Sequence, residues 1–308
     1  MRTVSFVLPA WKKRFLRRAI NTILNQTCPD WNLVVVDDCS PEPIKDTVCS
    51  FNDPRIRYVR NDYNLGGENL VKQWNHCISF AEGDWIVLAA DDDEYAPTFC
   101  EECLKLADKY PEVDLIRSRV EQIGENGEHL WDDGLLSEFT DKYEYLHDWL
   151  VSKAFTCIGN FMFRKSTLES IGGFMDFPCA FGSDIATPIA LSKNGVANTS
   201  EMLFRFRQSA QHLSADSGKY IQKLAGITQL SQWLRALDYE APVTEADKTF
   251  YAIHNEKYLH DKCVYDYFNL VIKHLPLNKL NYLKYCTLAS GKDKTMMILR
   301  WIKCRLFR

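Results

Sequence analysis

Three consecutive aspartates, Asp91, Asp92 and Asp93, follow directly after the apolar stretch WIVLAA at residues 85–90. Carboxylates a few ångströms apart repel one another and raise one another's pKa. That cost is tolerated where a cation lies between them or where the side chains diverge into solvent. Mg²⁺ and Mn²⁺ prefer oxygen ligands and commonly bind one or two carboxylates together with substrate phosphates. The cluster therefore predicts a metal ion that in turn holds a diphosphate.

Two further short groups of residues lie at the ends of apolar runs. Asp37 and Asp38 close the run at residues 32–38, and Pro9-Ala10-Trp11 closes the run at residues 3–9. In an open parallel sheet, ligands bind outside the carboxyl ends of the strands. An aspartate in such a loop can instead cap the next helix, but finding acids after several strands favours one binding edge.

The elements that would position these residues alternate between strand and helix patterns over the first 110 residues or so. This alternation predicts an α/β fold with a mostly parallel central sheet and right-handed crossovers. The expected strands are 3–9, 32–38, 55–61 and 85–90, and the expected helices are 14–27, 66–81 and 97–109. Later, 113–123 and 128–133 form an expected strand pair turning at Asn126-Gly127, and 195–207 ends in a strand. Beyond residue 217 the chain reads as helical, so we expect domains at 1–215 and 216–308.

Composition indicates an ordinary globular protein of 308 residues with a formal net charge of −4. This balance argues against a general nucleic-acid binder, which would be basic over most of a face. Among the 11 cysteines, Cys100 and Cys103 form the single CxxC, which we interpret as two reduced thiols on one helix. We see no signal peptide and no apolar run of bilayer-spanning length. The sequence thus predicts a cytoplasmic protein.

Longer segments resemble a known family. VSFVLPAWKKRFLRRAINTILNQTCPDWNLVVVDDCSPE is similar to the N-terminal signature of family 2 glycosyltransferases with the GT-A fold, as in bacterial cell-surface polysaccharide synthesis. The segments NLGG and NHCISFAEGDWIVLAADDDEYAP resemble the approach to their DxD motif. The resemblance covers about residues 3–110 and, more weakly, the chain to about residue 207. It implies a glycosyltransferase using a nucleotide-diphosphate sugar.

The resemblance implies specific nucleotide-binding residues. Pro9 and Trp11 lie where the family packs on the base, with Trp11 as the stacking aromatic; a core or interface aromatic is the alternative. Asp38 resembles the residue that contacts the base, and Asp37 is its competitor. Gly67, in NLGG, belongs to the same expected site.

The DxD motif aligns on Ala90-Asp91-Asp92, so its first acid is missing. The resemblance places Asp92 on Mn²⁺ or Mg²⁺ and Asp91 at the ribose or diphosphate, while Asp93 is expected to cap the next helix. His212 aligns with a histidine that meets the metal or diphosphate, although a lone loop histidine is more often merely solvated.

The second half of the chain carries the expected catalytic residue. In GGFMDFPCAFGSDIATPIALSKNG, Ser183-Asp184 occupies the family's acidic pair, which makes Asp184 the expected general base; its alternative is an N-cap. Gly159-Asn160 is expected to face the donor sugar. One base without a second carboxylate nucleophile, together with the resemblance, implies inversion at the anomeric carbon.

The sequence leaves alternatives for the donor, for the acceptor and for whether the chain is catalytic. A UDP-sugar is the expected donor, and a glycan or lipid-linked hydroxyl is the expected acceptor. A non-catalytic sugar-nucleotide-binding protein of the same fold is the alternative, supported by the missing acid. A nucleotidyltransferase would need a Gly-rich loop after the first strand, and a dehydrogenase would need GxGxxG; the chain has neither.

The stretch KDKTMMILRWIKCRLFR at residues 292–308 is basic, with Ile298, Leu299, Ile302 and Leu306 at helical spacing. Trp301 and Phe307 lie near the edge of this stripe. Such a helix can lie on an anionic membrane surface, which would place the protein peripherally on the cytoplasmic face of the membrane. The alternative is that the stripe packs on the catalytic domain.

Overall fold

The computed structural model describes residues 3–209 and 217–306, and the chain divides into two compact units. Unit 1 comprises residues 1–176 and 184–212, and unit 2 comprises residues 177–183 and 213–308. No helix in these described ranges is both long enough and apolar enough to cross a bilayer.

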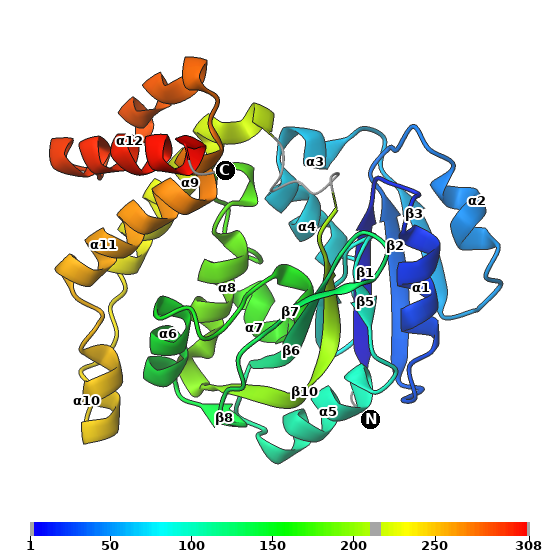
Figure 1. The fold of residues 1–308 in the computed structure, drawn as a ribbon. Helices are drawn as coiled ribbons and strands as arrows, with labels where there is room; N and C mark the ends of the chain where they lie inside the picture. Colours follow the sequence, from blue (N-terminus) through cyan, green and yellow to red (C-terminus); the bar gives the residue numbers. More distant parts are fainter. Residues whose placement is uncertain (1–2, 210–216, 307–308) are drawn as a thin grey trace. The chain divides into compact units, whose positions relative to one another are not determined.

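Four parallel strands form the first half of the sheet in unit 1 (Figure 1). They are β1 (Val4–Ala10), β2 (Trp31–Asp37), β3 (Ile56–Arg60) and β4 (Trp85–Leu88), in the spatial order β3-β2-β1-β4. The central strands β1 and β2 are buried along most of their length, as expected for parallel strands covered on both faces. All four expected strands are therefore confirmed, and their carboxyl ends share one edge.

Helices connect these strands and cover the sheet. Alternate residues of β1 share a core with the buried stripe of α1 (Leu16–Leu24) and with α5 (Phe99–Lys109). The short helix α2 (Ile44–Cys49) follows β2. The helix expected at 66–81 is divided into α3 (Leu65–Glu68) and α4 (Leu70–Ile78). Asn69 has extended backbone dihedrals there, and its side chain accepts a hydrogen bond from Lys72 N, capping α4.

The rest of the sheet is mixed in direction. It contains β5 (Glu94–Tyr95), β6 (Leu115–Ile123), β7 (His129–Asp132), β8 (Phe139–Thr140), β9 (Phe161–Arg164) and β10 (Val196–Arg207). Strand β9 joins β4 to β6 with antiparallel pairing, whereas β6 and β10 run parallel. The expected hairpin is present as β6–β7, and Gly127 in its turn has φ +92°, a conformation that favours glycine. The predicted α/β fold, with a central sheet whose first four strands are parallel, is confirmed.

Helices α6 (Lys142–Leu150), α7 (Lys165–Ser170) and α8 (Ser183–Leu191) complete the α/β part of the chain. Asp141 caps α6 by accepting hydrogen bonds from Tyr143 N and Glu144 N. On α5, Cys100 and Cys103 are both buried, and burial raises the pKa of each thiol. This environment matches inert structural thiols.

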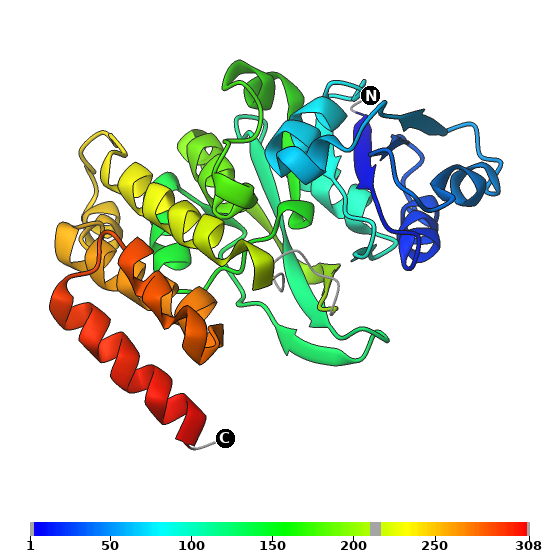
Figure 2. The same cartoon turned by 90° about the horizontal axis from the view of Figure 1, so that it is seen from above.

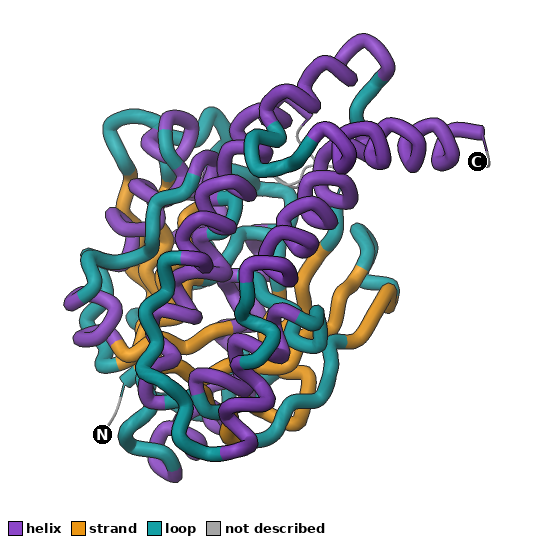
Figure 3. Tube along the Cα trace, turned by 90° about the vertical axis from the view of Figure 1, so that its left-hand side faces the viewer, coloured by secondary structure: helices purple, strands orange, loops and turns teal. Residues whose placement is uncertain are grey.

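All the secondary-structure elements in the described residues of unit 2 are helical (Figure 3). Its elements are α9 (Tyr220–Arg235), α10 (Glu245–Tyr251), α11 (Glu256–Asp266), the short turns η6 (Tyr267–Val271), η7 (Ile272–His274) and η8 (Leu277–Tyr285), and α12 (Gly291–Leu306). They enclose a separate apolar core that includes Leu224, Tyr267, Ile272 and Trp301. Figure 2 shows α12 lying alongside the segment that contains η7.

Candidate functional site

The loops that follow β1 and β4 are joined by Asp91. Its Oδ2 accepts hydrogen bonds from the backbone N–H groups of Trp11, at 3.0 Å, and Lys12, at 2.8 Å. Asp91 lies 80 positions after Trp11 and 79 positions after Lys12 in the chain. The backbone that carries the aromatic after the first strand therefore contacts the first of the acids after the fourth strand.

The three aspartates carry raised pKa values. Burial, with the charge of Asp92 as the second cause, raises the pKa of Asp91 to about 6. Burial also raises the pKa of Asp92, against the opposing charges of Lys12 and Arg207. The pKa of Asp93 lies well above its usual value because of burial and the charge of Asp92. A cation bound here would lower the cost of ionising the cluster.

Arg207, the last residue of β10, anchors the acidic loop. This fully buried residue donates from its backbone N–H to Asp93 Oδ1 at 2.9 Å and from Nε to the Asp92 carbonyl at 2.8 Å. Its guanidinium also pairs with Glu94 and bonds the Gly124 and Glu125 carbonyls. The expectation that Asp93 caps the next helix is wrong, because Thr98 is the N-cap of α5. Asp93 instead anchors the end of β10.

Asp37 ends β2 and is fully buried among donors. Tyr58 donates a hydrogen bond of 2.6 Å to its Oδ2, Arg60 forms an ion pair with the same oxygen, and Ser40 N donates to Oδ1 at 2.7 Å. Burial and this hydrogen bond raise the pKa of Tyr58 to about 12. The carboxylate of Asp37 thus stabilises the loop after β2.

Asp38 organises the segment that precedes α4. Its Oδ1 accepts hydrogen bonds from Asn61 Nδ2 and Leu65 N, and its Oδ2 accepts one from Gly66 N at 2.7 Å. A Cβ on Gly66 would approach Asp38 Oδ2 to 2.8 Å, so the close approach depends on glycine. The adjacent Gly67 is exposed and donates its N–H to Asn64 Oδ1.

Trp11 is not a core aromatic, because its side chain is 36% exposed. Its carbonyl accepts a hydrogen bond of 2.6 Å from Ser40 Oγ, which joins the loops after β1 and β2. Pro9 pairs with Val36 in the parallel ladder and is half-buried. An aromatic face beside the acidic loop is suited to stacking on a planar base.

Asp184 lies in the first turn of α8. The helix begins at Ser183, so the alternative that Asp184 is its N-cap is wrong. The charges of both Asp93 and Asp184 raise the pKa of the buried Cys157 thiol, after burial as the main cause. The two carboxylates are therefore near one thiol, although they are separated by 91 positions in the sequence.

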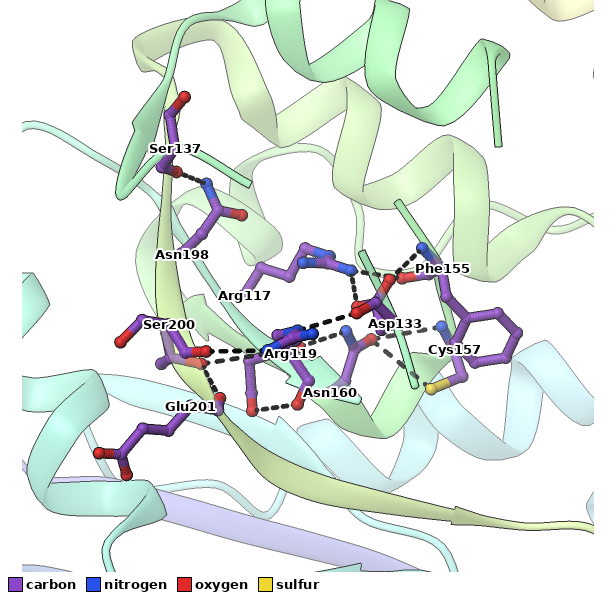
Figure 4. A network of polar contacts seen from close by, with 12 residues as sticks. Arg117, Arg119, Asp133, Ser137, Phe155, Cys157, Asn160, Asn198, Ser200 and Glu201 are labelled. Carbon is purple, nitrogen blue, oxygen red and sulfur yellow. Dashed lines mark hydrogen bonds and ion pairs between the residues drawn. The ribbon is translucent and has the colours of Figure 1, made fainter. Parts of the chain in front are cut away.

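A buried polar network supports the chain around Cys157 (Figure 4). Arg117 on β6 pairs with Asp133, and both side chains are almost fully buried. Asp133 Oδ1 accepts a hydrogen bond from Phe155 N at 2.9 Å, and Arg117 donates to the Phe155 carbonyl at 3.0 Å. The sequence analysis missed this pair because its partners come from separate strands and loops.

Asn160 belongs to the same network. It is fully buried and donates to the Ser118 carbonyl at 2.8 Å, so its amide is engaged within the protein. That the Gly159-Asn160 loop faces the donor sugar stays a prediction. Its neighbour Gly159 packs against the ring of Phe204, where a Cβ would come within 2.7 Å. This loop shapes the interior of unit 1.

The described residues, 3–209 and 217–306, bear on the metal-binding prediction. They contain no cluster of three or more His, Cys, Asp or Glu side chains suited to a metal ion, and His212 lies outside them. Asp92 is half-exposed, and the positive charges of Lys12 and Arg207 act on its carboxylate. One or two carboxylates plus substrate phosphates fit Mg²⁺ or Mn²⁺, so Asp92 and Asp91 match a site that the diphosphate completes.

Curated relatives match about a third of the chain. The Escherichia coli K12 protein WcaA, named for glycosyl transfer in colanic acid biosynthesis, is 38% identical over 97 residues, covering 30% of this chain and 34% of that protein. The Escherichia coli UDP-Glc:alpha-D-GlcNAc-diphosphoundecaprenol beta-1,3-glucosyltransferase WfgD is 30% identical over 91 residues, covering 29% and 35%. The chain therefore spans about a third of the length of these relatives.

Solved structures share the fold over nearly the whole chain. S. aureus TarS 1–349 in complex with UDP-GlcNAc superposes with a TM-score of 0.69 at 15% identity, covering 94% of this chain and 82% of that one. The mannosyltransferase PcManGT from Pyrobaculum calidifontis, in complex with GDP-Man and Mn²⁺, gives 0.59 at 17% identity, covering 100% and 81%. At these identities the likeness establishes the fold.

The family model of glycosyl transferase family 2 matches residues 5–172, which is more than half of the 308 residues. This span contains β1 to β4, the loop that carries Asp91 to Asp93 and the network around Arg117. The chain belongs to glycosyl transferase family 2.

Proposed function

We propose that this chain transfers a sugar from a UDP-sugar to a hydroxyl group of a glycan or lipid-linked acceptor in bacterial surface polysaccharide synthesis. The observation that carries the proposal is the junction of the loops after β1 and β4 by Asp91, which places the exposed Trp11 beside the half-buried Asp91 and Asp92 and the buried Asp93. TarS in complex with UDP-GlcNAc and the named donor of WfgD support UDP. We propose a hexosyl or N-acetylhexosaminyl group as the transferred sugar.

On the donor side, Trp11 stacks on the base, next to Pro9. Asp38 and Asp37 act chiefly by ordering the loops that border the base, because their oxygens already accept hydrogen bonds within the protein. Gly67 adds an exposed backbone position at the start of the helical segment. These residues bind the nucleotide, whereas Asp91, Asp92 and Asp184 act in the chemical step.

Asp92 and Asp91 would hold Mn²⁺ or Mg²⁺ together with the donor's diphosphate, and we propose that His212 joins them. The bound ion would neutralise charge that develops on the leaving diphosphate. Lys12, whose charge opposes the pKa rise of both acids, would act on the same phosphates. Because the first acid of the DxD motif is missing, metal binding at this site would depend on oxygen ligands from the diphosphate.

On the acceptor side, we propose Asp184 as the general base. The acceptor oxygen attacks the anomeric carbon, the bond from that carbon to the diphosphate breaks, and the hydroxyl proton passes to the Asp184 carboxylate. A single displacement of this kind inverts the anomeric centre. The closeness of Asp184 and Asp93 to Cys157 supports this assignment, because it brings the helix α8 acid toward the acidic loop.

A transfer assay tests the proposal. Purified protein is incubated with radiolabelled UDP-glucose or UDP-N-acetylglucosamine, Mn²⁺ and a polyprenyl-diphosphate-linked sugar, and labelled lipid is extracted. We expect labelled product from one donor and none after EDTA treatment. Donor binding without transfer to any acceptor in an acceptor panel would favour the alternative, a non-catalytic binding protein. A lipid-linked acceptor would also place the protein in the cytoplasm, at the inner face of the membrane.

A further inference from the structure

Helix α12 has apolar side chains on two opposite faces. Met297 and Trp301 are buried in the core of unit 2, and Trp301 Nε1 donates a hydrogen bond of 2.9 Å to the Leu275 carbonyl. On the opposite side, Leu299, Ile302 and Leu306 are 55%, 41% and 72% exposed. Their spacing of three and four residues places them in one stripe. The helix is thus held by one apolar face while the other faces solvent.

Packing within unit 2 fixes which face is exposed. Arg305 donates to the Leu275 carbonyl at 2.8 Å, and Asp293 lies 3.1 Å from His260 Nε2. The stripe of Ile298, Leu299, Ile302 and Leu306 is therefore left uncovered by the core of unit 2, and Trp301 lies on the buried face instead of the stripe's edge. Packing of this stripe on the catalytic domain stays the alternative.

The exposed stripe lies in a strongly basic surrounding. Residues 291–306 contain five Lys or Arg and one acid, in a chain whose formal net charge is −4. The acid, Asp293, is engaged by Ser290 and His260. Lys292, Arg300 and Lys303 are exposed on the same helix. The helix has 16 residues and its charges rule out a spanning role.

We propose that the outward stripe of α12 binds the surface of an anionic lipid bilayer, with the leucine and isoleucine side chains entering the headgroup boundary and the basic side chains contacting anionic headgroups. Apolar burial combined with attraction to anionic lipid is the general basis of such interfacial helices. A second copy of the chain fits less well, because a symmetric contact across this stripe would bring like charges together. The interaction requires neither sugar donor nor acceptor.

Sedimentation of the full chain with sucrose-loaded vesicles tests the proposal without any substrate. We expect binding to vesicles of equal parts phosphatidylcholine and phosphatidylglycerol, weak binding to phosphatidylcholine alone, and release at high salt. Leu299→Gln/Ile302→Gln should lower the partition coefficient on the order of tenfold or more. Its matched control, Val243→Gln/Leu277→Gln, removes two side chains that are 85% and 72% exposed elsewhere in unit 2 and should bind as wild type.

Substitutions of the basic side chains separate the electrostatic contribution to vesicle binding from the apolar contribution. Lys292→Gln/Lys303→Gln should weaken binding by about fivefold for each basic side chain removed, whereas the exposed Lys257→Gln should change nothing. Circular dichroism should report unchanged helix content in every variant, since only exposed side chains are replaced.

Three results would overturn the proposal. They are equal binding to neutral and anionic vesicles, full retention of binding by Leu299→Gln/Ile302→Gln, and absence of vesicle binding with a dimer that the same variant dissociates. The last result would assign the stripe to a second copy of the chain. A failed transfer assay with intact vesicle binding would refute the proposed function and leave this inference standing.

Discussion

Arg207 Nε donates a hydrogen bond of 2.8 Å to the backbone carbonyl of Asp92, across 115 positions of sequence. Through this bond the last residue of β10 fixes the backbone of the acid that we assign to the metal. The same arginine neutralises charge from Asp93 and Glu94, which are buried beside it. The geometry of the acidic loop therefore depends on the end of the sheet as well as on β4.

Replacing Arg207 with methionine should destabilise unit 1 by about 3–5 kcal/mol, because it leaves buried carboxylates without their partner. Urea denaturation followed by tryptophan fluorescence measures the change. Arg205→Met is the matched control, since Arg205 lies on the same strand with a side chain that is 47% exposed in its ion pair with Glu121; it should cost about 0–1 kcal/mol. Equal effects of the two substitutions would contradict the bracing role of Arg207.

The sequence predicted the parts of the site that depend on local pattern. Apolar runs ending in acids gave the parallel strands and the edge where Trp11 and Asp91 meet, because strand direction alone brings those ends together. The role of Arg207 could not be predicted, since nothing local distinguishes it from the exposed Arg205 two positions earlier. The role of Asp93 could not be predicted either, because its partner, Arg207, lies 114 positions away in the sequence.

Trp11→Ala should weaken UDP binding by about 5- to 150-fold, the range that corresponds to ~1–3 kcal/mol of base stacking. Trp11→Phe should retain most of the affinity, because a phenyl ring still offers a face to the base. Isothermal calorimetry measures both constants. Trp131→Ala removes another exposed tryptophan, 44% exposed on β7, and should leave UDP affinity unchanged. Wild-type affinity in Trp11→Ala would exclude stacking.

Metal-dependent nucleotide binding should rise between pH 5 and pH 7, because burial and the charge of Asp92 raise the pKa of Asp91 to about 6. Below that value Asp91 is protonated and contributes no charge to the cation; above it, the carboxylate is ionised. Calorimetric titrations with Mn²⁺ across this pH range measure the effect. Asp91→Asn should bind more weakly and lose this rise, and a mutant curve parallel to wild type would assign the pH dependence elsewhere.

Asp184→Asn should reduce sugar transfer by about 10²- to 10⁴-fold, the usual contribution of a general base. UDP binding should remain at the wild-type level, because the substitution leaves the donor-side loops intact. The labelled-lipid assay and calorimetry on the same preparation give the two readouts. Asp176→Asn, at an exposed carboxylate nearby in the sequence, should keep its transfer activity. Transfer retained by Asp184→Asn would remove this residue from the catalytic role.

The most direct test of the donor site is calorimetric binding of UDP, GDP, TDP and CDP to the wild type and to Asp92→Ala, with Mn²⁺ and with EDTA. The account predicts Mn²⁺-dependent binding of UDP by the wild type, lost in EDTA and in Asp92→Ala. Absence of nucleotide binding under every condition, or equal UDP binding by Asp92→Ala, would contradict the assignment of the acidic loop to a metal-held diphosphate.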